Sequence, residues 1–148
     1  MSTNVRRLTG GLALASVLAV LGCSDSGSPT APSPSGPTPL NITYTLAPGE
    51  STVLPGTGNV LMFQRVTEDS RCPAAAMCIH SGQAVVALGL LIGGDATQPF
   101  SLATTPAGRS TRLGEIEFTL ERVTPYPITF PIDFPQSAYR IEIRVVRS

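Results

Sequence analysis

From residue 40 onward, apolar and polar side chains alternate along short segments of the chain. In residues 139–145, apolar side chains alternate with Arg140, Glu142 and Arg144. A period of two is typical of a strand with one buried and one solvated face. We therefore predict strands at residues 40–46, 51–54, 59–66, 84–92, 100–104, 115–121 and 139–145.

Turn residues separate these segments, and none of them has a helical period. The chain has 14 glycines and 14 prolines in 148 residues, which suits strands joined by turns. Residues 84–92 are apolar on both faces, so we place them in the centre of a sheet. About seven short strands favour an all-β, immunoglobulin-like sandwich of two sheets, with a small β-barrel as the alternative.

The N-terminus has a different pattern, in which Arg6 and Arg7 precede an apolar run at residues 8–21. The run is shorter than the roughly 20 residues that a membrane-spanning helix needs. A positive start, a short apolar core and a small residue before the cleavage point are typical of a secretory signal peptide. We therefore predict that residues 1–22 are a signal peptide.

The end of this run, Val20-Leu21-Gly22-Cys23, resembles the lipobox of bacterial lipoproteins, although Val20 stands where leucine is usual. The resemblance implies that Cys23 is acylated, becomes the mature N-terminus and holds the protein on a membrane. An ordinary signal peptide and an uncleaved membrane anchor are the alternatives. Ser24 favours the outer membrane, because aspartate there resembles an inner-membrane retention signal. We expect an extracytoplasmic protein of the bacterial cell envelope.

Residues 24–39 contain five prolines and no large apolar side chain. Such a segment cannot bury enough surface to offset the entropy of ordering. Extended at roughly 3.1 Å per residue, it would reach up to about 50 Å. We predict three parts: a signal peptide (1–22), an acylated cysteine with a proline- and serine-rich tether (23–39), and a β-sandwich domain (40–148).

Composition excludes several classes of function. Ten basic and ten acidic residues give a net charge of zero, which argues against a nucleic-acid partner. All ten basic residues are arginine, so chemistry that needs lysine is excluded. The single histidine, His80, is accompanied by no catalytic serine or zinc motif. We predict no enzyme activity and no cofactor.

With Cys23 assigned to the anchor, Cys72 and Cys78 remain. Outside the cytoplasm a disulfide is the default, and a free dithiol or a metal site is the alternative. Met77, Cys78 and His80 also bring two sulfur atoms and an imidazole close together, which are ligands that copper(I) favours. A disulfide would leave only Met77 and His80 for a metal.

The cysteine segment, DSRCP at residues 69–73 and CIHSG at residues 78–82, resembles a family of uncharacterised bacterial secreted proteins and lipoproteins. Its members carry DSRCP, a few residues and then C-[IV]-W-x-G, and they have a similar L-x-x-V-x-P-x-P segment, here at residues 120–127. His80 replaces the tryptophan. The resemblance covers roughly residues 40–148 and implies a β fold without an established activity.

Asp69 and Arg71 are candidate binding residues within this motif. Arg71 can form a two-pronged pair with Asp69 or Glu68, which would clasp the loop. A site for an anionic ligand is the alternative interpretation of the same residues.

Residues 124–136 (TPYPITFPIDFPQ) combine four prolines with Tyr126, Phe130 and Phe134. Proline excludes regular strand pairing, and the aromatic residues are too many for a solvated loop. The segment is either a connection folded over one end of the sandwich or an exposed loop that contacts an envelope protein or glycan. We expect a binding or structural module with an unknown ligand; the alternative is a small copper-handling lipoprotein that uses Met77 and His80.

Overall fold

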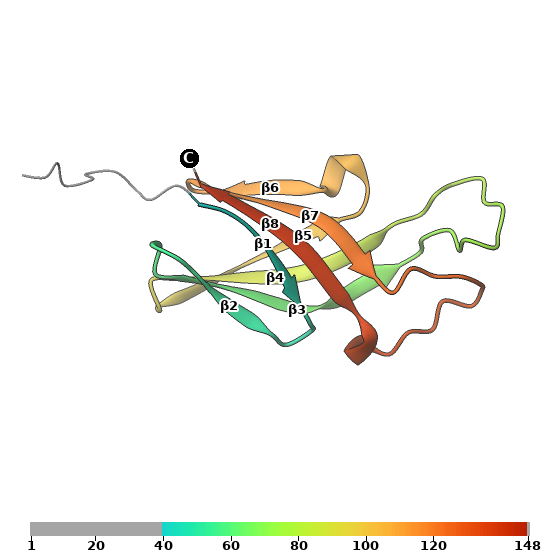
Figure 1. Cartoon of the computed structure of the whole chain (residues 1–148), viewed down its shortest axis with the longest axis horizontal. Helices are drawn as coiled ribbons and strands as arrows, with labels where there is room; N and C mark the ends of the chain where they lie inside the picture. Colours follow the sequence, from blue (N-terminus) through green and yellow to red (C-terminus); the bar gives the residue numbers. More distant parts are fainter. Residues whose placement is uncertain (1–39, 148) are drawn as a thin grey trace, which may run out of the picture. The chain divides into compact units, whose positions relative to one another are not determined.

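The computed structural model describes residues 40–147, which form two antiparallel sheets packed face to face (Figure 1). The elements are β1 (Leu40–Leu46), β2 (Ser51–Leu54), β3 (Asn59–Asp69), β4 (Ala84–Ile92), β5 (Ala96–Ala103), η1 (Pro106–Gly108), β6 (Ser110–Leu113), β7 (Ile116–Thr124), η2 (Gln136–Ala138) and β8 (Arg140–Arg147). One sheet has the order β1-β8-β7-β6 and the other β2-β3-β4-β5. The predicted two-sheet sandwich is confirmed, and the strands do not close into a barrel.

The core lies between the two sheets and is formed by the apolar faces of the alternating strands. Phe63 on β3, Phe118 on β7 and Ile143 on β8 are fully buried, and β4 is an interior strand as predicted. Both sheets contribute to one continuous cluster of buried side chains. Residues 40–147 therefore contain a complete two-sided hydrophobic core.

The sandwich has eight strands, one more than the pattern indicated. The additional strand, β6, has four residues and only one half-buried apolar side chain, Leu113, so it shows little alternation. β5 begins at Ala96, before the predicted start at residue 100, because its first four residues are exposed and form no apolar face. Pro99 is tolerated there because β5 is an edge strand, where a missing N–H breaks no ladder on the open side.

Bulges explain why β3 and β7 run beyond their predicted ends. The register of β7 against β8 shifts between Leu120 and Arg122, so that Val123 returns to the buried face. In β3 the register shifts twice, and the strand continues to Asp69. Each bulge interrupts the period of two without ending the strand.

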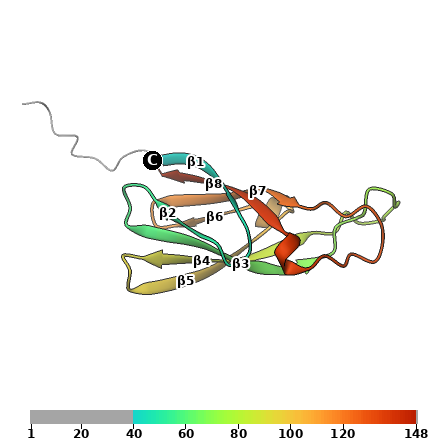
Figure 2. The same ribbon diagram turned by 60° about the horizontal axis from the view of Figure 1, so that its bottom comes forward.

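The strand pairing gives the sandwich two distinct ends. Leu40 of β1 and Ile116 of β7 both pair with Arg147 of β8, at the end where the chain enters the domain. Thr124 pairs with Arg140 at the opposite end, from which two long loops project (Figure 2). The predicted signal peptide, Cys23 and the tether at residues 23–39 lie outside the described residues.

Candidate functional site

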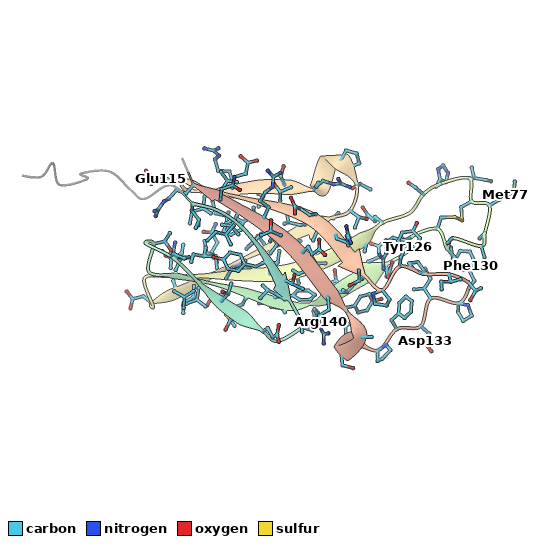
Figure 3. All side chains as sticks on the ribbon, viewed as in Figure 1. Met77, Glu115, Tyr126, Phe130, Asp133 and Arg140 are labelled. Atoms are coloured by element: carbon cyan, nitrogen blue, oxygen red, sulfur yellow. A yellow bond between two sulfur atoms is a disulfide. The ribbon has the colours of Figure 1, made fainter. Side chains whose placement is uncertain are left out.

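Two loops meet at the end of the sandwich opposite Leu40. The disulfide loop (residues 70–83) joins β3 to β4, and the proline-rich loop (residues 125–135) joins β7 to η2. Together, residues 72–80 and 125–135 are called the tip below. Figure 3 shows the labelled side chains of Met77, Tyr126 and Phe130 gathered there, far from Glu115 at the other end.

Hydrogen bonds join the two loops directly. The Ala74 amide donates to the Pro127 carbonyl oxygen at 3.0 Å, and the Ala75 amide donates to the Ile128 carbonyl oxygen at 3.0 Å. The Tyr126 hydroxyl donates to the Cys72 carbonyl oxygen at 2.9 Å. The loops are therefore one structural unit, although they lie about 50 residues apart in the sequence.

A disulfide between Cys72 and Cys78 closes the first loop, as the sequence predicted, with 6.0 Å between the two Cα atoms. Below it the two arms of the loop pair like a short ladder. The Cys72 amide donates to the Ser81 carbonyl oxygen at 2.8 Å, and the Ser70 amide donates to the Gln83 carbonyl oxygen at 2.7 Å. The disulfide and this ladder stabilise the loop, which projects from the end of the sheet (Figure 1).

Gly82 lies in this ladder, in the returning arm. Its φ of +62° is in the left-handed region, which glycine adopts most readily. A Cβ atom at this position would run into the carbonyl oxygen of Ser70 on the opposite arm. The close approach of the two arms therefore depends on glycine at position 82.

Arg71 and Asp69 form a buried clasp at the base of both loops. The Arg71 Nε donates to Asp69 Oδ1 at 2.7 Å, and Nη2 donates to Oδ2 at 2.6 Å. Both side chains are almost wholly buried. The sequence left Asp69 and Glu68 as possible partners of Arg71, and the structure shows the pair with Asp69.

The same guanidinium also binds the second loop. Arg71 donates to the carbonyl oxygens of Val123 and Pro125, both at 2.7 Å, and lies 5.2 Å from the centre of the Tyr126 ring. Arg71 thus links the start of the disulfide loop to the start of the proline-rich loop. This geometry favours the structural interpretation of Asp69 and Arg71, because their charged atoms bond to each other and to the backbone.

Tyr139 completes the clasp, since its hydroxyl donates to Asp69 Oδ2 at 3.0 Å. Burial, reinforced by the Asp69 charge, raises the pKa of Tyr139 to about 12. Burial alone would raise the pKa of Asp69. The hydrogen bonds and charge of Arg71, with the Tyr139 hydroxyl, outweigh that effect and hold the pKa of the Asp69 carboxyl below its usual value.

The outer surface of the tip is apolar and exposed. Met77 and Ile79 are 103% and 97% exposed, and Ile128, Phe130 and Tyr126 are 68%, 62% and 54% exposed. Among the residues of the tip, only His80 and Asp133 can carry a charge near neutral pH. Large apolar side chains gathered in this way usually mark an interaction surface.

The structure separates the three predicted aromatic contact residues. Tyr126 and Phe130 are exposed at the tip, whereas Phe134 is half-buried and packs against the core. Its ring meets that of Tyr139 edge to face, with 5.9 Å between the ring centres. The proline-rich loop therefore combines the two interpretations: one part is folded over the sandwich end and another part is exposed.

Two exposed residues of the tip, Ile79 and Ile128, were missed from the sequence. Each lies in a segment without strand or helix period, flanked by cysteine or proline. An isoleucine outside every alternating segment is not expected to face the core. This observation could have indicated that Ile79 and Ile128 are exposed. A hollow of about 230 Å³ lies beside Ile128, lined by Tyr126, Pro131 and Phe134 among others.

The candidate metal ligands give no enclosed site. Met77 and His80 are both exposed, and Cys78 is bonded to Cys72. Among residues 40–147, no group of three or more histidine, cysteine, aspartate or glutamate side chains is placed to hold a metal ion.

In the part of the chain that the structure describes, no helix is long and apolar enough to cross a membrane. Comparison with family models, with curated proteins and with solved structures finds no match for this chain. The resemblance of the cysteine segment to the DSRCP family therefore stays a prediction from its residues.

Proposed function

We propose that the chain is a lipoprotein of the bacterial cell envelope whose β-sandwich is a binding module, with the tip as its contact surface. The observation that carries this proposal is the group of exposed apolar side chains on two loops that brace each other. Exposing Met77 and Ile79 to water is unfavourable, and neither side chain packs in the core. A contact made by the tip would remove these side chains from water.

The position of the tip supports this arrangement. The predicted tether joins the domain at Leu40, and the tip lies at the opposite end of the strands. A module anchored through Cys23 would thus present the tip away from its point of attachment. The lipobox-like segment that ends at Cys23 supports the anchor.

The anchor is tested by intact mass of membrane-extracted protein, with and without reduction and alkylation. We expect the mass of residues 23–148 plus acyl groups, with two thiols alkylated only after reduction. A mass without lipid would contradict the anchor.

The contact is tested separately, by placing a photoreactive amino acid at Ile79 in cells and, as a control, at Val53. Val53 is also exposed but lies on β2. We expect adducts at position 79 well above those at position 53. Equal, background adducts at both positions would contradict a contact function for the tip.

No observation favours the alternative of copper handling. The disulfide removes Cys78, and two exposed side chains, Met77 and His80, are fewer ligands than a stable site requires.

A further inference from the structure

We infer that the tip binds by inserting its apolar side chains into the surface of a lipid bilayer. This inference rests on the proposal that the tip is the contact surface, and it names the partner. The residues that would enter the membrane are Met77, Ile79, Ile128 and Phe130, with Tyr126 behind them.

The shape and exposure of these side chains suit a fluid partner. Met77 and Ile79 are almost completely exposed. Figure 3 shows Met77 at the end of the projecting disulfide loop. A protein partner would need a pocket shaped to each of them, whereas a bilayer accepts projecting side chains of any shape. Phe130 and Tyr126 are of the aromatic type that is enriched where hydrocarbon meets headgroups.

Part of the tip backbone, its prolines and three paired alanine amides, is suited to a medium without water. A polar backbone group that enters hydrocarbon unpaired is costly. Five of the tip residues are prolines, which have no N–H group. The amides of Ala74, Ala75 and Ala76 all donate to carbonyl oxygens, those of Pro127, Ile128 and Pro73 respectively.

The charge of the tip indicates which bilayer property it would recognise. It contains no arginine or lysine, and its only groups that can be charged near neutral pH are His80 and Asp133. Attraction to anionic lipids therefore contributes little, and the binding should depend on buried apolar area. Binding to neutral phosphatidylcholine, insensitive to salt, is the expected signature.

The lengths of the tether and of the domain determine which bilayer the tip could meet. The sixteen residues 24–39 reach up to about 50 Å when extended. The longest strand, β3, has 11 residues and spans about 36 Å at roughly 3.3 Å per residue. The disulfide loop projects beyond β3 (Figure 1). An upright domain would therefore present the tip to a bilayer that faces the anchor, and the tip would meet the membrane that holds Cys23 only with the domain tilted along that surface.

The absence of tryptophan from the chain allows a direct test. Phe130→Trp places a single fluorophore at the tip, and Val53→Trp places a matched one on an exposed position of β2. Both are made in the chain that begins at Ser24, which lacks the lipid anchor and retains the complete core and disulfide. Each is titrated with phosphatidylcholine vesicles and with vesicles containing brominated phosphatidylcholine.

We expect the Trp emission of the Phe130→Trp chain to shift to shorter wavelength and to be quenched by brominated lipid, with no response from the Val53→Trp chain. Adding Ile79→Ser to the Phe130→Trp chain should lower the partition coefficient about tenfold, because an apolar side chain no longer enters the membrane. Adding Ile92→Ser, at the opposite end, should leave it unchanged. Since Ile79 is 97% exposed, its substitution does not threaten folding.

The inference would be overturned by no response at position 130, by an equal response at both positions, or by a shift that appears without vesicles as protein concentration rises. Binding that requires anionic lipid and disappears in salt would overturn it as well. If position 79 forms adducts with a protein or glycan in cells while vesicles give no response, the proposed function stands and this inference fails.

Discussion

At the scale of single residues, Gly82 controls whether the disulfide loop can form its ladder. A side chain at this position meets the Ser70 carbonyl oxygen, and the positive φ adds backbone strain. Gly58 is a matched control, since its φ is +70° but a Cβ atom there meets nothing within 4 Å. Comparing substitutions at the two glycines therefore separates the cost of backbone strain from the cost of the steric clash.

We expect Gly58→Ala to lower the free energy of unfolding by about 1 kcal/mol and Gly82→Ala by at least about 3 kcal/mol. Urea denaturation of both variants measures the difference. Equal losses would mean that the arms of the loop can separate without cost.

The Asp69 carboxylate makes stability depend on pH in one direction. Its pKa is lowered in the folded protein, so the stability linked to it is fully present above the unfolded value of about 3.9. This stability is lost as the pH falls through the lower pKa of the folded state. Asp69→Asn removes the titrating group and leaves the buried Arg71 charge without its partner.

We therefore expect Asp69→Asn to cost about 3–5 kcal/mol at pH 7. Its stability should also fall less than that of the original chain between pH 5 and pH 2, as measured by the free energy of unfolding across that range. An unchanged pH dependence would show that the clasp does not link protonation to folding.

At the scale of elements, the proline-rich loop has a supporting part and an exposed part. Phe134 packs on Tyr139 and the core, and Gln136 holds β3 by exchanging two hydrogen bonds of 3.0 Å with the backbone of Val66. Phe130 has no comparable support and is 62% exposed.

We expect Phe134→Ala to lower the free energy of unfolding by about 2 kcal/mol, because it leaves a gap above the core. Phe130→Ala should change it by less than about 0.5 kcal/mol. Thermal and urea unfolding of the two variants check this. A large loss from Phe130→Ala would assign the whole loop to the fold and remove the main support for a contact surface.

How far the elements could be predicted depended on their periodicity. β1, β2 and β4 were predicted to their observed bounds, because each alternates or is continuously apolar. β6 and the start of β5 were missed because edge strands bury few side chains and show weak patterns. The bulges of β3 and β7 shift the period, which hid their last residues.

The candidate site was predictable only in its parts. The disulfide between Cys72 and Cys78 was predicted, and Arg71 was expected to pair with Asp69 or Glu68, because these residues are neighbours in the sequence. The bonds from Ala74 and Ala75 to the other loop join segments more than 50 residues apart. The pattern of apolar and polar residues does not indicate such contacts. That the two loops form one tip could therefore be seen only in the structure.

At the scale of the whole molecule, the described domain has a hydrophobic core of its own. Both sheets, the disulfide and a continuous core lie within residues 40–147. We expect a chain of residues 40–148 to have the same urea midpoint as a chain of residues 24–148, because the tether has no large apolar side chain to bury. A lower midpoint for the shorter chain would show that the tether packs on the domain.

The direction of β1 determines how the domain would carry a pulling force. The strand runs from Leu40, where the tether attaches, toward Leu46 and the tip end, and it pairs with β8 from Leu40–Arg147 to Leu46–Ile141. If the tip were held while the anchor moved, tension would act along β1. Its hydrogen bonds to β8 lie across that direction, so they would share the load in shear instead of opening one after another. The domain would thus form a mechanically resistant link between the proposed anchor and any partner bound by the tip.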